Sequence, residues 1–216
     1  MRQFEPDYPL IKKMKQYPSI SREIQEDMEV YVFEKLDGSN IRAEWSPKRG
    51  FYKFGTRKRL LGDDDPLFGE ALGLIRKQGE NLTDIFKSLR FENAIAYFEF
   101  LGPNSFAGLH EKEPHKVVLL DVDVYKKGFM TPVEFLRAFE GRANIPKFLY
   151  YGKIDKQIES TIRSGNFPGA SFEGVVCKSN PPRTWSLPVM FKIKNQAWVD
   201  RVMELHGNKS NLEDFL

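Results

Sequence analysis

The fold is decided by a stretch that reads Val30-Tyr31-Val32-Phe33-Glu34-Lys35-Leu36-Asp37-Gly38-Ser39-Asn40. In this stretch Lys35 directly follows an apolar run typical of a β-strand, and an Asp-Gly pair typical of a turn comes two residues later. A lysine amine has a reference pKa of about 10.4, so it attacks a phosphate near neutral pH only where its surroundings activate it. Alone, such a pattern is more often a strand that runs into a turn than a catalytic site.

Four later stretches also place residues suited to catalysis within or beside apolar, strand-like runs. In chain order they are Gly55-Thr56-Arg57, Tyr97-Phe98-Glu99-Phe100, Phe172-Glu173-Gly174-Val175-Val176 and Phe191-Lys192-Ile193-Lys194. One such stretch arises easily by chance, whereas five in this order do not. We therefore expect one site assembled from five segments of the chain.

The ordered set resembles the motifs of the covalent nucleotidyltransferase superfamily, which contains ATP-dependent DNA ligases, RNA ligases and mRNA capping guanylyltransferases. The resemblance covers roughly residues 30–195. Asn40, where DNA ligases and capping enzymes usually carry arginine, is similar to the bacteriophage RNA ligase 2-like branch. The resemblance implies an α+β fold, an ATP-grasp-like nucleotidyltransferase domain of mainly antiparallel sheets flanked by helices.

The resemblance also implies an ATP-dependent polynucleotide ligase that joins 3′-hydroxyl and 5′-phosphate RNA ends, as in RNA repair. Lys35 would attack the α-phosphate of ATP and hold AMP as a phosphoramidate, and AMP would then pass to the 5′-phosphate end. Lys192 and Lys194 would bind the α-phosphate and, with Mg²⁺ or Mn²⁺, lower the pKa of Lys35. Glu34 and Asp37 would act in the opposite direction on that pKa.

Carboxylates are the expected metal ligands, because Mg²⁺ prefers oxygen and takes one or two carboxylates together with substrate phosphate. Glu173 is the main candidate, and Glu99 and Asp37 are further candidates; Glu99 is also a candidate for the ribose hydroxyls. The alternative for either glutamate is a buried salt bridge.

Four more residues are expected around the nucleotide by the same resemblance. Asn40 and Arg57 would orient ribose, phosphate or the incoming strand end, and Glu34 would border the adenine edge. Leu120 stands where many relatives present an aromatic residue, so it would contact the purine through van der Waals packing. Its segment, residues 117–122, equally describes an ordinary buried strand.

Periodicity gives the expected elements. Strands are predicted over residues 30–33, 41–45, 51–54, 94–101, 117–125, 172–178 and 189–194, and helices over 67–90, 131–142, 155–165 and 196–206. Alternation in the last strand places Lys192 and Lys194 on one face, with Phe191 and Ile193 directed into a core. Two adjacent lysines would repel each other unless an anion such as a phosphate lies between them. From this segment alone a plain edge strand with lysines in solvent is the more common explanation, and only the other four stretches favour the phosphate site.

Composition allows a core, with 41% hydrophobic and 13% aromatic residues among 216. The formal charge is only +3, so any nucleic-acid surface must be local. Residues 48–59 are the densest basic stretch, and their interleaved aromatic residues suit an RNA backbone with stacked bases; a solvated hairpin is the alternative. The three histidines, His110, His115 and His206, share no ligand-like spacing and are predicted to lie in loops or at the surface.

The sequence further indicates an intracellular protein. Cys177 is the single cysteine, so no internal disulfide can form, and no apolar run reaches the roughly 20 residues that cross a bilayer. Residues 1–7 lack the apolar region of a signal peptide. We expect a cytoplasmic monomer without a membrane partner, and a phage-encoded enzyme that acts in the host cytoplasm is compatible with this expectation.

Only 22 residues follow Lys194. Residues 1–216 are therefore expected to form one nucleotidyltransferase domain without a C-terminal accessory domain, either as a minimal ligase or as a fragment. Two alternatives to an RNA ligase stay open: a DNA ligase or capping guanylyltransferase domain, and a catalytically silent RNA-binding module.

Overall fold

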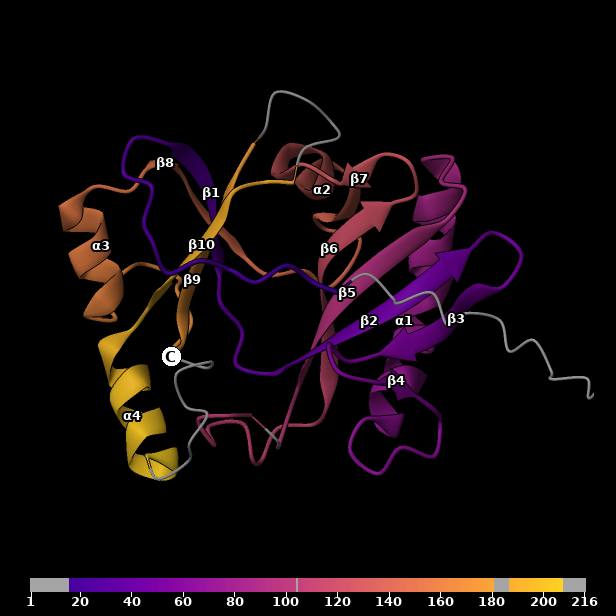
Figure 1. Ribbon diagram of the computed structural model, residues 1–216, viewed down its shortest axis with the longest axis horizontal. Coiled ribbons are helices and arrows are strands. Elements are labelled where there is room, and N and C mark those ends of the chain that lie inside the picture. Colours follow the sequence, from indigo (N-terminus) through magenta and orange to yellow (C-terminus); the bar gives the residue numbers. More distant parts are fainter. Residues whose placement is uncertain (1–15, 104, 181–186, 208–216) are drawn as a thin grey trace, which may run out of the picture.

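The computed structural model describes residues 16–103, 105–180 and 187–207, so the predictions made for residues 1–7 lie outside the described part. Two antiparallel sheets lie side by side, and helices flank them (Figure 1). The predicted α+β class is confirmed. No helix in the described residues is long and apolar enough to span a membrane.

The larger sheet has six strands in the order β4-β3-β2-β5-β6-β7. Their bounds are β2 Ser39–Ser46, β3 Gly50–Gly55, β4 Leu60–Leu61, β5 Ala94–Leu101, β6 Lys116–Val124 and β7 Gly128–Phe129. Helix α1, Gly69–Ser88, packs on one face of this sheet, and α2, Pro132–Phe139, follows β7. Thr131 caps α2 through the predicted capping box with Glu134.

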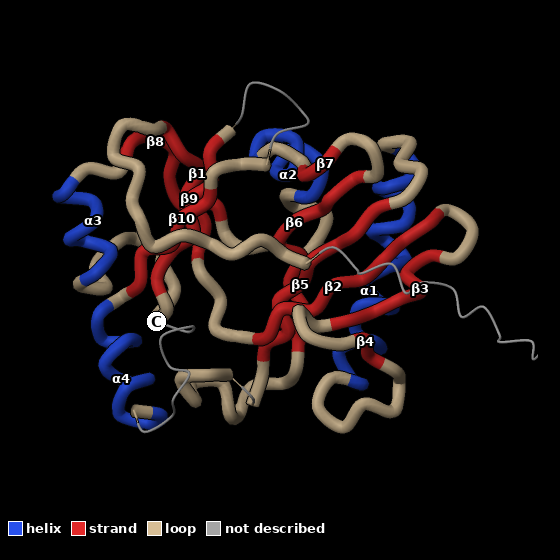
Figure 2. The backbone as a smooth tube through the Cα atoms, in the orientation of Figure 1, coloured by secondary structure: helices blue, strands red, loops and turns tan. Residues whose placement is uncertain are grey.

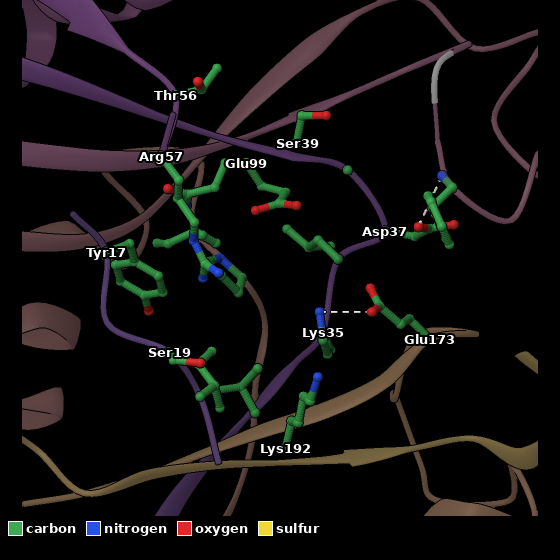
Figure 3. A pocket seen from close by; sticks show the side chains of 18 of the residues that line it. Tyr17, Ser19, Lys35, Asp37, Ser39, Thr56, Arg57, Glu99, Glu173 and Lys192 are labelled. Atoms are coloured by element: carbon green, nitrogen blue, oxygen red, sulfur yellow. Dashed lines mark hydrogen bonds and ion pairs between the residues drawn. The ribbon is translucent and has the colours of Figure 1, made fainter. Parts of the chain in front are cut away.

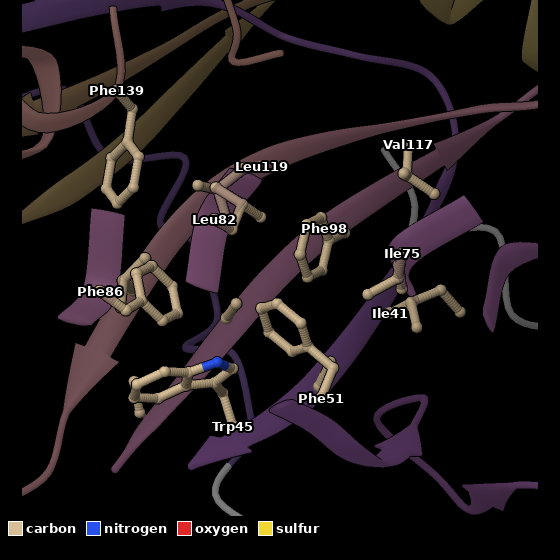
Figure 4. Close-up of a cluster of buried hydrophobic side chains, with 14 of the residues drawn as sticks. Ile41, Trp45, Phe51, Ile75, Leu82, Phe86, Phe98, Val117, Leu119 and Phe139 are labelled. Atoms are coloured by element: carbon tan, nitrogen blue, oxygen red, sulfur yellow. The ribbon is translucent and has the colours of Figure 1, made fainter. Parts of the chain in front are cut away.

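The main core lies between this sheet and α1 (Figure 4). Trp45 from β2 meets Phe86 from α1 edge to face, with ring centroids 5.1 Å apart. Phe51 and Phe98 add further edge-on ring contacts. This packing leaves the opposite face of the sheet for polar side chains.

The smaller sheet has four strands in the order β10-β9-β1-β8. Their bounds are β1 Glu29–Glu34, β8 Phe148–Lys153, β9 Gly174–Ser179 and β10 Met190–Lys194. Helix α3, Lys156–Arg163, covers the buried face, and α4, Gln196–His206, follows β10. Phe191 and Ile193 are fully buried in this core, as the alternation in their strand predicted.

Several element ends differ from the sequence prediction. The first helix starts at Gly69 rather than residue 67, and Leu67 is 58% exposed. Helix α2 ends at Phe139 because Glu140 already has extended backbone angles. Strand β8 was not predicted. It is an edge strand with partly exposed residues on both faces, so it lacks the alternation that marks a half-buried strand.

The chain passes between the sheets twice, through residues 35–38 and through residues 130–147, which contain α2. Residues 35–38 pass directly from β1 in the smaller sheet to β2 in the larger one. The loop before β1 also crosses both sheets (Figure 2). In that loop Ser21 pairs with Phe191 of β10, and the Tyr17 hydroxyl donates a hydrogen bond to Asp121 of β6.

Candidate active site

Lys35 lies where the chain leaves β1 for the larger sheet. Its backbone N–H donates to the Gly174 carbonyl at 2.9 Å, and its own carbonyl accepts from the Ser171 hydroxyl. These bonds continue the pairing of β1 with β9 and bring Lys35 beside Glu173. The Lys35 Nζ lies 2.7 Å from Glu173 Oε1 (Figure 3).

Two glycines allow the backbone to come this close. A Cβ at Gly38 would lie 2.4 Å from the Phe100 carbonyl oxygen, and one at Gly174 would lie 2.2 Å from the Ile193 carbonyl oxygen. Gly174 also has a φ of +124°, a conformation that disfavours other residues. The glycines of the Asp-Gly and Glu-Gly pairs are therefore required by close strand contacts beside the site.

Lys192 and Lys194 extend from β10 into the same space. The Lys194 Nζ lies 3.2 Å from Glu173 Oε1 and 3.7 Å from the centre of the Trp198 ring. Burial lowers the pKa of both lysines to about 8, and the positive charge of Lys35 acts in the same direction. An anion between these amines would relieve that repulsion.

The pKa of Lys35 is raised in the protein alone. Burial acts to lower it, but the nearby carboxylates of Glu173, Glu99 and Asp37 outweigh burial. The carboxylate of Asp37 raises this pKa, as predicted, whereas the lowering by Lys192, Lys194 and a metal ion was predicted for the nucleotide-bound enzyme and stays a prediction. In the protein alone Lys35 is an ammonium ion paired with Glu173.

The predicted metal-binding carboxylates have different surroundings. Burial raises the pKa of Glu99 to about 8; Lys35 opposes this shift and Glu173 adds to it. Asp37 accepts backbone hydrogen bonds from Phe106 at 3.1 Å and Ala107 at 2.9 Å. Figure 3 shows it turned away from the Lys35 amine. In the described residues no group of three or more His, Cys, Asp or Glu side chains is arranged to hold a metal.

All the residues predicted for the site line one cavity of about 640 Å³, a volume typical of a small-molecule site. They are Glu34, Lys35, Asp37, Asn40, Arg57, Glu99, Leu120, Glu173, Lys192 and Lys194. They come from both sheets and from the segments that join them. The prediction that the five stretches form one site is thus met by the geometry, while the role of each residue stays a prediction.

Three of the residues expected around the nucleotide are held by hydrogen bonds in which one partner is a main-chain group. Glu34 Oε1 accepts a hydrogen bond from the Lys147 N–H at 3.0 Å, and the Leu120 carbonyl accepts one from Lys178 Nζ at 3.0 Å. Asn40 Nδ2 lies 3.5 Å from the Phe98 carbonyl. The Leu120 side chain is half-buried at the cavity wall, as a van der Waals contact to a base requires.

Sequence reasoning missed a buried group at the cavity wall. Lys178 Nζ lies 2.7 Å from Asp121 Oδ2, and the Tyr17 hydroxyl donates to the same carboxylate. Alternation within the predicted strand 172–178 could have indicated Lys178, because it shares a face with Val176. The loop that contains Tyr17 has no periodicity that could have indicated it.

The histidines lie outside the cavity lining. His110 contacts Glu113 at 2.7 Å, His115 contacts Glu70 at 2.6 Å, and His206 contacts the Phe106 carbonyl at 2.8 Å. His110 and His115 lie in a loop, as predicted, and His206 is the last residue of α4.

The RNA ligase family model matches residues 28–194, most of the chain. This chain belongs to the RNA ligase family. The family prediction made from the ordered stretches is therefore confirmed. No curated protein matches the sequence.

This RNA ligase family member shares its fold with solved RNA ligase structures. It resembles a Naegleria gruberi RNA ligase mutant with ATP and Mn at 16% identity and a TM-score of 0.61, over 83% of this chain and 52% of that one. A second mutant, with AMP and Mn, matches at 16% identity and a TM-score of 0.61, over 90% and 60%. The same ligase with PPi matches at 18% identity and a TM-score of 0.60, over 96% and 65%. The chain thus spans 52–65% of the length of these relatives.

Proposed function

We propose that this RNA ligase family member transfers AMP from ATP to Lys35 and uses it to join 3′-hydroxyl and 5′-phosphate RNA ends. The observation that carries the proposal is the Lys35 amine, held in one cavity with the cations of Lys192 and Lys194 and the carboxylates of Glu173 and Glu99. The similar N. gruberi structures with ATP, AMP and PPi support the choice of nucleotide.

In the first step the Lys35 Nζ forms a bond to the α-phosphorus while the bond from that phosphorus to the bridging oxygen breaks. Pyrophosphate leaves with the electron pair, and the amine gives up its protons to solvent. Such in-line displacement depends on alignment and on neutralising charge. Lys192 and Lys194 would bind the α-phosphate oxygens, with Asn40 and Arg57 orienting the sugar and phosphates.

Activation of Lys35 requires that its ion pair with Glu173 be broken. Glu173 would hold a divalent cation, which would supply charge neutralisation at a substrate phosphate, and the Glu173 carboxylate would then no longer stabilise the Lys35 ammonium. Glu173 and Glu99 fit such a cation, because Mg²⁺ takes few protein carboxylates and completes its shell with phosphate and water. Asp37 fits less well, since both its oxygens already accept backbone hydrogen bonds.

Two further displacements would complete ligation. A 5′-phosphate oxygen attacks the phosphorus of the lysyl adduct and releases the Lys35 amine. The 3′-hydroxyl oxygen then attacks the 5′-phosphate phosphorus and releases AMP. The same cavity can serve each step, because every displacement occurs at phosphorus and needs the same cations.

The test is to incubate the protein with α-labelled ATP and Mg²⁺ or Mn²⁺ and to detect labelled protein on a denaturing gel. We expect an acid-labile, alkali-stable adduct that is absent in Lys35→Ala and present in Lys156→Ala, an exposed lysine on α3. No adduct, or an adduct that persists in Lys35→Ala, would refute the proposal. Nicked RNA against nicked DNA, and ATP against GTP, then distinguish an RNA ligase from a DNA ligase or a capping enzyme.

A further inference from the structure

The basic stretch at residues 48–59 is the strongest charge feature outside the catalytic cluster. It contains six basic residues and no acidic residue, so the rest of the chain carries a small net negative charge. A surface with mixed charges and a small net charge does not need a cluster of basic residues for solubility. The function of this basic stretch is therefore inferred from where the fold places it.

The structure distributes these cations along one strand. Lys48 and Arg49 lie in the turn before β3, and Arg57 and Lys58 lie in the turn after it and line the cavity. The six residues of β3 separate the two turns by about 20 Å, at roughly 3.3 Å per residue. We call Lys48, Arg49, Lys53, Arg57 and Lys58 the β3 strip.

The middle of the strip faces the cleft. Glu44 accepts hydrogen bonds from Lys53 at 2.9 Å and from the Tyr52 hydroxyl at 3.1 Å. It is four residues along β2 from Asn40, so both side chains lie on the cavity side of the sheet. The Arg49 guanidinium lies 3.7 Å from the centre of the Tyr52 ring. A guanidinium stacked on a ring is a surface on which an unpaired base can stack.

The charges at both ends of the strip are available to a ligand. Arg59 bonds to Asp65 and is for that reason left out of the strip. In the described part of the chain no carboxylate pairs with Lys48, Arg49, Arg57 or Lys58, whereas Lys53 pairs with Glu44. Four cations along about 20 Å match the repeated charge of a phosphodiester backbone better than a single small anion.

We propose that the β3 strip binds the backbone of an RNA strand whose end occupies the cavity. The inference rests on the proposed function, because it assigns the path of the strand that the cavity would join. The strand would run from Arg57 and Lys58 at the cavity, past Lys53, to Arg49 and Tyr52 at the hairpin.

Protection of a sheet edge is the competing explanation. Among the described residues β3 pairs on its outer side with β4 only at Phe54 and Gly55, which leaves the rest of that edge without a described partner strand. Charged residues on open edges prevent sheets from pairing. That role does not require cations in the cavity lining, and it does not require a lysine directed to the cleft side. If edge protection is the whole role, removing the charges raises self-association and leaves RNA affinity unchanged.

The test is the salt dependence of binding to a 5′-phosphorylated single-stranded RNA of about 12 nucleotides, followed by fluorescence anisotropy. Removing one cation that binds a phosphate reduces the slope of log K against log salt by about 0.7, which is about fivefold in affinity at 0.1 M salt. We expect this reduction for Arg49→Ala and for Lys58→Ala, and about twice the slope change for the Lys48→Ala/Arg49→Ala pair. Lys156→Ala is the matched control.

Labelling of Lys35 by ATP without RNA separates this inference from the proposed function. The Lys48→Ala/Arg49→Ala pair is remote from the cavity, so its adduct formation should equal that of the wild type. The inference would be overturned if every strip variant bound RNA with the affinity and salt dependence of the wild type, whether or not the variants self-associate. It would also be overturned if the wild type showed no salt-dependent RNA binding. Failure of Lys35 to label, with strip-dependent RNA binding intact, would overturn only the proposed function.

Discussion

The buried pair of Lys178 and Asp121 should couple the stability of the two sheets. Lys178 belongs to β9 in the smaller sheet and Asp121 to β6 in the larger one, and their side chains are only 7% and 5% exposed. In Lys178→Met the Asp121 carboxylate keeps the Tyr17 hydrogen bond but loses its cation. Removing one member of a buried pair leaves an uncompensated charge and costs about 3–5 kcal/mol.

For a domain of this size, 1 kcal/mol changes the melting temperature by about 2–4 °C, so we expect a decrease of about 6–20 °C for Lys178→Met. Asp121→Asn should destabilise by a comparable amount, because the Lys178 ammonium then keeps its hydrogen bond to the Leu120 carbonyl but has no carboxylate to balance its charge. The double variant Lys178→Met/Asp121→Asn contains no buried charge at this position. It should therefore be more stable than the sum of the two single changes predicts, by about 1–3 kcal/mol.

Urea unfolding followed by circular dichroism measures the three free energies of unfolding. Lys87→Met on the exposed end of α1 is the control for the change of lysine to methionine, and it should be within about 0.5 kcal/mol of the wild type. Additive effects of the two single changes would refute the reasoning, because they would show that the two side chains do not interact. A single change that costs less than about 1 kcal/mol would equally show that the pair is solvated.

Three further predictions concern α1, α2 and β10. Gly79→Ala should destabilise the protein by about 1–3 kcal/mol in thermal unfolding, because the added Cβ would lie 2.7 Å from a ring atom of Phe51. Gly73 has open space around it, so Gly73→Ala should stabilise the same helix by up to about 1 kcal/mol, and equal effects of the two changes would refute this contrast. Thr131→Ala should cost about 1 kcal/mol in urea unfolding because it removes the capping box of α2, and an unchanged midpoint would show that the cap contributes nothing. Titration calorimetry should show that ATP binds more weakly as the pH rises through about 8, because Lys192 loses its proton there. The pH dependence of ATP affinity should be smaller in Lys192→Met. If that variant keeps the wild-type dependence, another group is responsible for it.

Much of the site could be predicted because the decisive residues lie within regular elements. Alternation in a five-residue strand was enough to place Lys192 and Lys194 on one face and Phe191 and Ile193 in the core. The Thr131 cap followed from local sequence in the same way, since a capping box involves residues three apart. Such features need no knowledge of the tertiary structure.

Features that depend on distant contacts could not be predicted in this way. Tyr17 reaches Asp121 across 104 residues of sequence, and no local pattern indicates that hydrogen bond. Strand β8 exists because β1 offers it a partner edge, although its own sequence lacks alternation. The sign of the Lys35 pKa shift belongs to the same class, because the carboxylates that decide it come from three separate segments of the chain.

The raised pKa of Lys35 determines how the proposed chemistry must be ordered. Two neighbouring cations without a carboxylate would favour the neutral, reactive amine of Lys35. Here a carboxylate is present, because one oxygen of Glu173 contacts both Lys35 and Lys194. That oxygen can stabilise the amine as ammonium only while no cation competes for it. If Glu173 instead held a divalent cation beside the nucleotide phosphates, its carboxylate would no longer stabilise the Lys35 ammonium. The carboxylate that suppresses the nucleophile in the free protein would therefore also be the group that makes its activation depend on bound nucleotide.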